Sequence, residues 1–572
     1  AQLSRGLGDV YKRQDQCYGK RLKLEDIPPD DLATYSMIQR ADTVGVFQIE
    51  SRAQMQMLPR LRPRNFYDLV IEVAIIRPGP LQGKVVHPYL KRRHGQEAVS
   101  YAHESLKPIL AKTLGVPIFQ EQAMRIAMAV GDFTPGEANE LRKNIGAWNM
   151  KDFSRNLKPW LLKLERGMKQ KGIKRIFIDQ ILNEMKVFAN YGFPESHAAS
   201  FALIAYVSSF LKCHYPAAFI CGLLNSQPMG FYRPAELVET AKRAGVRIRP
   251  ICINHSQWDN TLEPEILKEH RPKTFALRLG LRNVSGLSRS GAEKIVEARR
   301  AMPERAERPS FLSSRYWLSL SEFTQSVTVF RDDMTALAAA NAFASLGIKR
   351  KGSIWAAEKA PLRRVLLEEK EKTMRWKEES LFEKVARDYE AFSLTLSQHP
   401  AQILRTGREQ GEAYWSYSIP VARLTLAKDL EKLINGERVF VFGMKVVMQG
   451  PPSAKGMKFF TLSDETGFFN LVFTPQIYDQ YGRLAEKTAY LCVRGRLQKA
   501  NEHHSILVYE VFAPMKSNNV LVFEDNDKTS IKEKSANKNT KKAEGKIPKK
   551  EAETKELSLV SYPELQKPRR FH

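Results

Sequence analysis

The sequence predicts a multidomain protein that is mainly α-helical at first, continues into a small all-β barrel and ends in a disordered basic tail. The chain has 572 residues, which is longer than a domain with a single hydrophobic core usually is. Of these residues, 43% are apolar. Apolar residues recur three and four apart between Ile118 and Leu224, but every second residue from Arg438 onward. The final stretch is rich in lysine and almost without aromatic residues, a composition that favours disorder.

The charge of the chain favours a polyanionic partner. Lys and Arg number 90 against 63 Asp and Glu, which gives a net charge of +27. The segment from Asn526 to His572 has 13 basic and 7 acidic residues, so a charge of +21 falls on the first 525 residues. We expect the tail to be either a solubilising segment or a nonspecific tether to DNA. Since most of the excess lies outside the tail, nucleic acid is the first candidate partner.

Several other classes of protein find no support in the sequence. No run reaches 18 uninterrupted apolar residues, and Ala198–Leu211 reads as a buried helix. The five cysteines form no CxxC pair, and the start lacks a signal peptide, so we expect a cytoplasmic protein without a membrane partner. We find no GxSxG, GxxxxGK[ST], GxGxxG or HExxH motif and no convincing pair of carboxylates for two metal ions. We therefore assign no catalytic and no metal-binding residue.

The segment from Val284 to Ile295 fits a helix-hairpin-helix. Gly286 and Leu287 would form the tight hairpin, and Ser288 stands where a second glycine is usual. Backbone N–H groups there and at Gly291, in the following helix, could bind a DNA phosphate, because they lack intrahelical acceptors. An ordinary turn between two helices is the alternative.

Five short strand-like segments follow one another within about 75 residues, as in small barrels of the OB type. They cover residues 438–447, 458–462, 469–473, 489–496 and 505–511, with a turn at Asp464–Gly467. Two aromatic pairs, Phe459/Phe460 and Phe468/Phe469, should each have one ring in the core and one outside. An outward ring beside basic residues suits stacking on single-stranded DNA, whereas packing against a neighbouring domain is the alternative. We assign Lys458, Phe460, Arg494 and Arg496 to DNA binding.

A third group of residues could contact an anion. Arg142 and Lys143 are adjacent in a helical segment, and Ser196 and His197 precede the helix Ala198–Leu211. Ser196 and His197 could cap this helix or donate to a phosphate. Ordinary solvated side chains are the alternative.

The segment Asp42–Arg52 resembles the bacterial C-family DNA polymerases, the family of the replicative polymerase III alpha subunit. The resemblance runs from about Tyr18 to Pro514 through the following motifs: Arg77–Pro80, Phe119–Gln122, Leu141–Lys143, Tyr191–Phe193 with Ser196 and His197, Lys212–Pro216, the hairpin and the barrel. Val44–Met57, Phe343–Arg350 and Phe460–Gly467 are most similar to the error-prone, translesion branch.

The resemblance implies a division of the chain into named parts. We expect residues 1–14 to be unmatched and spurious, 15–60 to be the end of the palm and entry to the fingers, 61–240 the fingers, 241–270 a connector, 271–350 the helix-hairpin-helix region, 351–435 a charged helical linker, 436–515 the OB-fold and 516–572 the disordered Lys-rich tail.

The resemblance also implies roles for single residues. Arg142, Lys143, Ser196 and His197 would face the phosphates of the incoming nucleotide, with Tyr191 near its sugar or base. Arg77 would touch template or primer phosphates, the hairpin would hold duplex DNA, and the barrel would hold single-stranded template.

The metal-binding aspartates of the family belong to a palm that this sequence does not show, so we expect Mg²⁺ to be bound there and this chain alone to be inactive. The expected partners are primed DNA and deoxynucleoside triphosphates, with other translesion proteins possible. Leu381 and Phe382 end a segment that partly resembles a sliding-clamp-binding peptide. The alternative function is a non-catalytic DNA-binding accessory protein.

Overall fold

The computed structural model divides the chain into two compact units, residues 1–369 with 501–503 and residues 370–500 with 504–572. The structure describes residues 2–19, 22–76, 86–145, 150–188, 193–228, 232–265, 274–304, 315–359, 378–406, 415–417, 424–450, 456–500, 503–512, 515–517, 520–523 and 570–571.

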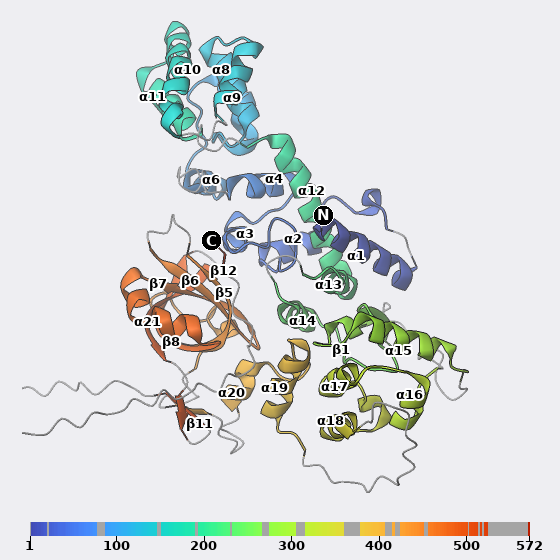
Figure 1. Ribbon diagram of the computed structural model, residues 1–572. Coiled ribbons are helices and arrows are strands. Elements are labelled where there is room, and N and C mark those ends of the chain that lie inside the picture. The colour runs from blue at the N-terminus through green and yellow to red at the C-terminus, as the bar shows by residue number, and fades with distance from the viewer. Residues whose placement is uncertain are drawn as a thin grey trace, which may run out of the picture. The chain divides into compact units, whose positions relative to one another are not determined.

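The first unit begins with a series of helices (Figure 1). They are α1 (Gln2–Tyr18), α2 (Leu32–Gln39), α3 (Arg52–Leu61), α4 (Phe66–Ile75), α6 (Val86–Arg93), α7 (Lys107–Leu110), α8 (Gln120–Gly131), α9 (Pro135–Ile145), α10 (Met150–Gln170), α11 (Arg175–Phe188), α12 (Glu195–His214), α13 (Pro216–Asn225) and α14 (Pro234–Arg243). The helical pattern predicted between Ile118 and Leu224 is thereby confirmed.

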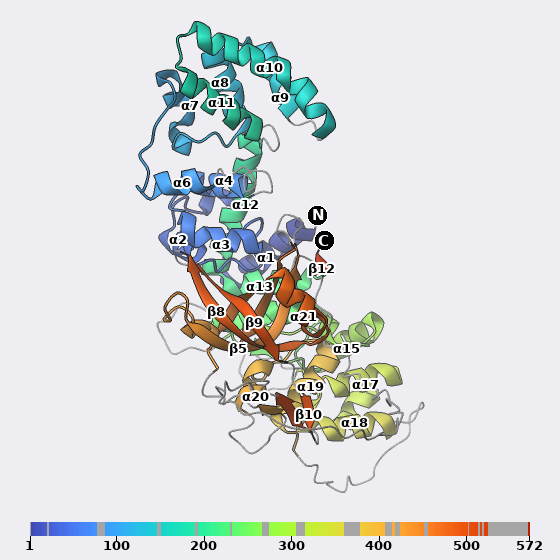
Figure 2. The same cartoon turned by 90° about the vertical axis from the view of Figure 1, so that its left-hand side faces the viewer.

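Helices α8 to α11 share one apolar core and lie together in both views (Figure 1 and Figure 2). Gly131 of α8 and Gly167 of α10 meet where the two helices cross. A Cβ atom on Gly167 would lie 2.4 Å from the carbonyl oxygen of Gly131, so only glycine allows this approach. At the start of α8, the Gln122 side chain accepts from the N–H groups of Ile118 and Phe119 at 2.8 and 3.0 Å.

The long helix α12 lies along α4 and is buried over most of its second half, as expected for Ala198–Leu211. Tyr215 separates it from α13, and the two helices are bent by 118°. Among the described residues, no single helix is long and apolar enough to cross a membrane, and α12 passes that test only together with α13.

A three-stranded sheet and four helices complete the first unit. The strands are β1 (Ile248–Arg249), β2 (Thr261–Pro264) and β3 (Phe275–Arg278), in the order β1-β3-β2, with β1 parallel and β2 antiparallel to β3. The helices are α15 (Arg289–Ala301), α16 (Leu320–Ser326), α17 (Arg331–Ala339) and α18 (Arg350–Lys359). Gly286 has φ +81°, which glycine adopts freely, and forms the predicted hairpin before α15.

The second unit contains the barrel. Its elements are α19 (Leu381–Phe392), α20 (Pro400–Thr406), β4 (Trp415–Tyr417), β5 (Arg438–Gln449), β6 (Lys458–Asp464), β7 (Gly467–Phe473), α21 (Pro475–Lys487), β8 (Tyr490–Ala500) and β9 (His503–Phe512). The sheet order β5-β6-β7-β9-β8 closes through an additional pairing of β5 with β8. All five predicted strands are therefore confirmed.

Two buried polar side chains fix local geometry around the barrel. Asp464 accepts from the N–H groups of Thr466 and Gly467 at 2.7 and 3.0 Å, which closes the predicted turn. The Lys445 ammonium donates to the carbonyls of Ala485 and Glu486 at 2.6 and 2.7 Å, and so caps the C-terminal end of α21. Helix α21 and the sheet β1-β3-β2 had not been expected from the sequence.

The expected linker and tail fall partly outside the described residues. Residues 360–377 are not described, and the described part of the predicted linker 351–435 contains the strand β4 as well as helices α18, α19 and α20. Short strands β10 (Met515–Ser517), β11 (Val520–Phe523) and β12 (Arg570–Phe571) lie within or beside the segment 516–572, for which we predicted disorder. The prediction otherwise concerns residues 524–569, which lie outside the described residues.

Candidate nucleotide and nucleic-acid interface

The N-terminal end of α12 presents Ser196 and His197 to solvent. Because N–H groups in the first turn of a helix lack intrahelical acceptors, this end of α12 favours an anion. The Ser196 hydroxyl and the His197 imidazole can both donate hydrogen bonds to phosphate oxygens. The two residues thus lie at a helix end that is suited to a phosphate group.

Neighbouring helices hold this first turn in place. The Glu195 N–H donates to Glu121 Oε2 at 2.9 Å, and the Tyr67 hydroxyl donates to Glu195 Oε1 at 2.7 Å. The N–H of Gln120 donates to the carbonyl of Phe193 at 3.0 Å, which ties the start of α8 to the start of α12. Burial and the carboxylate of Glu195 raise the pKa of Tyr67, so its hydroxyl remains a donor.

A row of rings continues from this end of α12. The ring centroid of His197 lies 5.5 Å from that of Phe193 and 4.5 Å from that of Phe201. Phe201 lies 5.5 Å from Phe47, which belongs to the segment Asp42–Ser51. The row therefore orients the His197 ring and links it to that segment.

Arg142 and Lys143 lie in the last turn of α9, and each bonds to a neighbouring residue of the same helix. Both Nε and Nη2 of Arg142 donate to Asn139 Oδ1, at 3.1 and 3.0 Å. Lys143 pairs with Glu140 at 2.8 Å, and both side chains are at least half exposed. Among the described residues we find no direct contact that joins these two cations to Ser196 or His197, so the structure shows two separate groups.

The segment Asp42–Ser51 is anchored by a buried lysine that the sequence analysis missed as a site residue. The Lys212 ammonium, on a side chain that is 4% exposed, donates to the carbonyl and to Oδ1 of Asp42 at 2.8 and 2.7 Å. Burial lowers the pKa of Lys212, while burial raises the pKa of the neighbouring Glu50 to about 7. A lysine directly after the mainly apolar run Ala198–Leu211 was the available signal.

The same segment contains a strained residue. Gln48 has φ +66°, which is unusual for a residue other than glycine, and the N–H of Ile49 donates to the carbonyl of Phe47 across it at 2.8 Å. Such conformations cluster at functional sites. Gln48 is therefore a further candidate residue, because it neighbours Phe47 at the end of the row of rings.

The hairpin offers fewer donors than its sequence suggested. The Ser288 N–H donates to Asp333 Oδ1 at 2.7 Å, and its hydroxyl donates to Oδ2 at 2.9 Å. The N–H of Gly291 donates to the Ser288 hydroxyl oxygen, and that of Leu287 donates to the Val284 carbonyl. Three of the four residues expected to bind phosphate, Leu287, Ser288 and Gly291, thus already donate their N–H groups to acceptors within the protein. Asp333 lies buried in the first turn of α17.

The assignment of Phe460 to DNA binding is wrong. Phe460 is fully buried in the barrel core, 4.6 Å from the ring of Phe473. Because successive residues of a strand face opposite sides, Phe459 is the outward member of its pair, and Phe468 is the outward partner of the buried Phe469. Both outward rings lie on β6 and β7, the second and third barrel strands, whose face binds oligonucleotides in OB-folds.

Two of the three basic residues assigned to DNA binding, Arg494 and Arg496, lie on β8, where they alternate with buried residues. Arg494 pairs with Glu510 and lies 5.8 Å from the ring of Phe440, while the exposed Arg496 lies 5.8 Å from the ring of Tyr509. Lys458 begins β6 and lies 5.3 Å from the ring of Tyr478. Of the three, Lys458 shares a strand with Phe459.

Three other expected contacts remain predictions. Arg77 and Tyr191 lie outside the described residues. Leu381 and Phe382 lie in the first turn of α19, where the Ser380 hydroxyl and Glu383 form a capping box. Phe382 packs against a small apolar cluster that includes Phe442 and Phe512, so its ring takes part in packing within the unit.

The described residues offer no set of three or more carboxylates that could hold Mg²⁺. One cluster of potential ligands is found in this part of the chain, and it consists of Asp31, Cys213 and His214. Since Mg²⁺ prefers oxygen ligands, the thiol and imidazole do not suit it. This cluster therefore does not suit magnesium.

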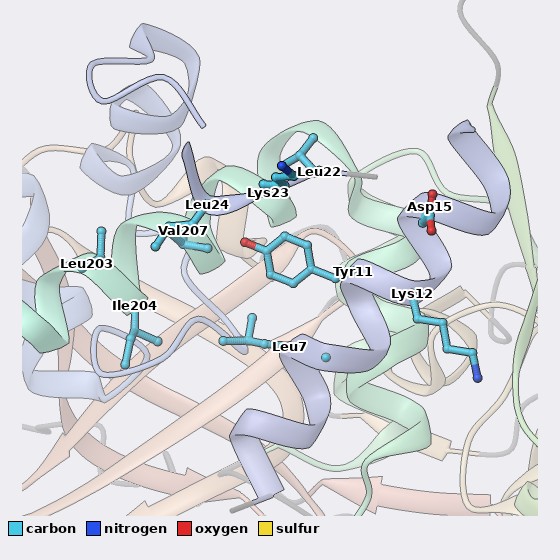
Figure 3. A pocket seen from close by; sticks show the side chains of 11 residues that line it. Leu7, Tyr11, Lys12, Asp15, Leu22, Lys23, Leu24, Leu203, Ile204 and Val207 are labelled. Carbon is cyan, nitrogen blue, oxygen red and sulfur yellow. The ribbon is translucent and has the colours of Figure 1, made fainter. Parts of the chain in front are cut away.

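A pocket of about 700 Å³ lies between α1 and α12 (Figure 3). Tyr11 lies between the two helices, with Leu203, Ile204 and Val207 of α12 on the opposite wall. None of the residues assigned to nucleotide or DNA binding lines it. This pocket and the candidate interface are therefore distinct.

Three domain families match the chain in succession. The bacterial DNA polymerase III alpha subunit finger domain matches residues 6–172, a helix-hairpin-helix motif matches residues 245–353, and an OB-fold nucleic acid binding domain matches residues 439–513. The chain therefore matches, in order, a polymerase finger domain, a helix-hairpin-helix motif and an OB-fold nucleic acid binding domain. The finger match begins inside the segment 1–14, for which we expected no match.

Curated relatives extend this agreement along most of the chain. It is 43% identical over 504 residues to the error-prone DNA polymerase of Methylococcus capsulatus, which covers 84% of this chain and 45% of that protein. It is 45% identical over 457 residues to the error-prone DNA polymerase of Alkalilimnicola ehrlichii, with 79% and 42% covered, and 43% identical over 505 residues to that of Burkholderia pseudomallei, with 86% and 44% covered.

The chain is thus similar over most of its length to relatives that are named error-prone DNA polymerases, and residues 6–172 match the finger domain of the bacterial DNA polymerase III alpha subunit. It spans less than half the length of these relatives. The comparisons support the polymerase reading and not the accessory-protein alternative.

Proposed function

We propose that the chain is the nucleotide- and DNA-binding part of an error-prone DNA-directed DNA polymerase that acts in translesion synthesis during DNA repair. The observation that carries the proposal is that Ser196 and His197 lie at the exposed N-terminal end of α12. The adjacent Glu195 fixes this end through its hydrogen bond to Glu121, and the chain matches a polymerase finger domain. Positively charged and hydrogen-bond-donating groups at such an end stabilise a triphosphate.

Each part of the chain then has a role in holding the substrates. Ser196 and His197 donate to the phosphates of the incoming nucleotide, and Arg142 and Lys143 also contact this nucleotide. Tyr191 contacts the sugar or base, and Arg77 contacts the DNA backbone. The hairpin region binds duplex DNA, with Gly286 allowing close approach of the backbone, and the barrel binds the single-stranded template through Phe459 and Phe468.

Phosphoryl transfer would require Mg²⁺ held by aspartates of a palm. The resemblance assigns these aspartates to the palm and gives them no counterpart in this sequence, so the palm would bind the metal and this chain alone would be inactive. Two primer-extension reactions test this, each with Mg²⁺ and all four nucleotides. We expect no extension by the chain alone, and extension when the palm of a relative precedes it in one polypeptide. Extension by the chain alone would contradict the assignment of metal binding to the palm.

Substitutions in the active polypeptide test the nucleotide site. We expect His197→Ala and Arg142→Ala each to lower kcat/KM for the nucleotide by about 10- to 150-fold, the range for a lost charge-assisted hydrogen bond. Affinity for primed DNA should stay nearly unchanged. Arg175→Ala is the matched control, since Arg175 is an exposed arginine of the same helical body that pairs with Glu165 and Asp179. Equal losses of DNA affinity would mean that these residues bind DNA and not the nucleotide.

A further inference from the structure

The last turn of α12 and the residue before α2 bring three potential metal ligands together. Cys213 and His214 are consecutive in α12, and Asp31 is the N-cap residue of α2. One ligand atom from each side chain lies within 4.8 Å of those of the other two. His214 Nε2 lies 2.8 Å from Asp31 Oδ2.

The donor set identifies the class of ion. A thiolate, an imidazole nitrogen and a carboxylate oxygen together suit Zn²⁺, whereas Mg²⁺ and Ca²⁺ take oxygen ligands. With bonds of about 2.3 Å to sulfur and about 2.1 Å to nitrogen and oxygen, the donors of a tetrahedral zinc site lie about 3.3–3.6 Å apart. Small side-chain rotations would bring the three atoms from their present spacing to this one. We propose that Asp31, Cys213 and His214 bind Zn²⁺, with water as the fourth ligand.

The surroundings already hold the ligands in position. The N–H and hydroxyl of Thr34 donate to Asp31 Oδ2 at 2.8 and 2.6 Å. The Asp31 N–H donates to the Tyr206 hydroxyl oxygen at 3.0 Å. The ring of Phe210 lies 4.4 Å from that of His214. Such outer contacts orient the ligands of metal sites and raise their affinity.

A zinc ion at this site would link the last turn of α12 to the segment before α2. The Tyr206 hydroxyl donates to the carbonyl of Pro28 at 2.5 Å, so the segment Pro28–Asp31 already lies on α12. The residue before Cys213 is Lys212, which anchors the segment Asp42–Ser51 through Asp42. The last turn of α12 would therefore fix both segments. This inference does not depend on the proposed polymerase function.

Cobalt provides the direct test, because Co²⁺ occupies zinc sites and absorbs visible light. We expect the full chain to give a thiolate-to-cobalt charge-transfer band and the visible bands of a tetrahedral ion, with Zn²⁺ displacing both. Cys213→Ser should remove the charge-transfer band. His214→Gln and Asp31→Asn should each weaken Co²⁺ binding at least about tenfold, the lower end of the effect of perturbing such a site.

Cys17 is the matched control, since it is a partly buried cysteine of the same unit outside the ligand cluster. Cys17→Ser should leave the spectrum and the affinity unchanged. If the chain shows no charge-transfer band, or keeps it in Cys213→Ser, the proposal is wrong.

A measurement on the unsubstituted chain covers the case in which a variant fails to fold. Zn²⁺ should slow alkylation of Cys213 by iodoacetamide at least about tenfold, as followed by peptide mass mapping, because a metal-bound thiolate is withheld from the reagent. The rate at Cys17 should not change. Equal rates at Cys213 with and without Zn²⁺ would overturn the proposal.

Discussion

Helix α12 and the strand pair β6–β7 both carry candidate ligand-binding residues, but the two kinds of element differ in which neighbouring residues they expose. In α12 the neighbours Ser196 and His197 are both exposed, because they share the first turn of a helix that becomes buried further along. In β6 the neighbours Phe459 and Phe460 face opposite sides, one half-buried and one fully buried. A helix end thus presents consecutive residues, whereas a strand presents alternate residues.

The two regions also differ in what they bury. The barrel core consists of apolar side chains. The helical unit encloses Glu50 and Lys212 between α12 and the segment Asp42–Ser51. We infer that stability depends on pH around that segment.

The largest expected effect separates the two faces of β6. Phe460→Ala should destabilise the barrel by about 3–5 kcal/mol, because it removes a buried ring and leaves a cavity. Phe459→Ala should leave stability nearly unchanged and weaken binding of single-stranded DNA by about 1–3 kcal/mol, the value of one stacking contact. Thermal unfolding followed by circular dichroism and fluorescence anisotropy of a labelled oligonucleotide measure the two effects.

The second aromatic pair serves as an internal control for this comparison. Phe469→Ala should behave like Phe460→Ala, and Phe468→Ala like Phe459→Ala, because the same alternation applies on β7. If Phe460→Ala weakened DNA binding while the barrel remained fully folded, the inward assignment of its ring would be wrong.

The buried carboxyl of Glu50 provides the next largest effect. Burial raises its pKa from 4.5 to about 7, so the folded state favours the neutral carboxyl. Its contribution to stability is present in full below pH 4.5 and is lost as the pH rises to about 7. This pKa shift of Glu50 corresponds to about 3 kcal/mol in the free energy of unfolding, which is the upper limit of the stability lost as the pH rises.

Replacing this group should flatten the pH dependence. We expect the Tm of Glu50→Gln to fall less than that of the unsubstituted chain between about pH 4.5 and 7. Glu25→Gln is the control, since the Glu25 side chain is 74% exposed and makes only a surface ion pair with Lys23. A parallel decline in all three proteins would contradict the assignment of this pH dependence to Glu50.

The smallest expected effect concerns the outward arginines of the barrel. Affinity for DNA should fall steeply with salt, because phosphate contacts release counterions. Arg496→Ala should reduce the slope of log affinity against log salt by about 1 if Arg496 contacts a phosphate. Arg494→Ala should reduce it less, since Glu510 already neutralises Arg494.

Lys432 supplies the control for these arginines, because it belongs to the same unit and pairs with Asp429 at 2.8 Å. Lys432→Ala should leave both the affinity and the slope unchanged. If the slope of log affinity against log salt did not change in Arg496→Ala, the face of β8 that carries Arg496 would not belong to the DNA interface. The face that carries Phe459 and Phe468 would then be the remaining candidate.

Sequence periodicity predicted elements well and side-chain partners poorly. The strands from Arg438 onward were predicted because alternation and turn residues recur together. Alternation does not say which residues face inward, and the choice of Phe460 was wrong for that reason. The hairpin was placed correctly by Gly286, but Asp333, 45 residues away from Ser288, takes up donors that looked available. Lys212 was missed because its acceptor Asp42 lies 170 residues earlier in the chain.

The sequence by itself determined the excess of positive charge, the succession of helical, hairpin and barrel regions and the residues at the start of α12, because these follow from composition and local spacing. Only the tertiary structure decided which aromatic ring enters the barrel, which hairpin N–H groups are already bonded and which cations are anchored. It also brought Asp31 beside Cys213 and His214 across more than 180 positions. Such pairings depend on contacts between residues far apart in the chain, and a local pattern carries no information about them.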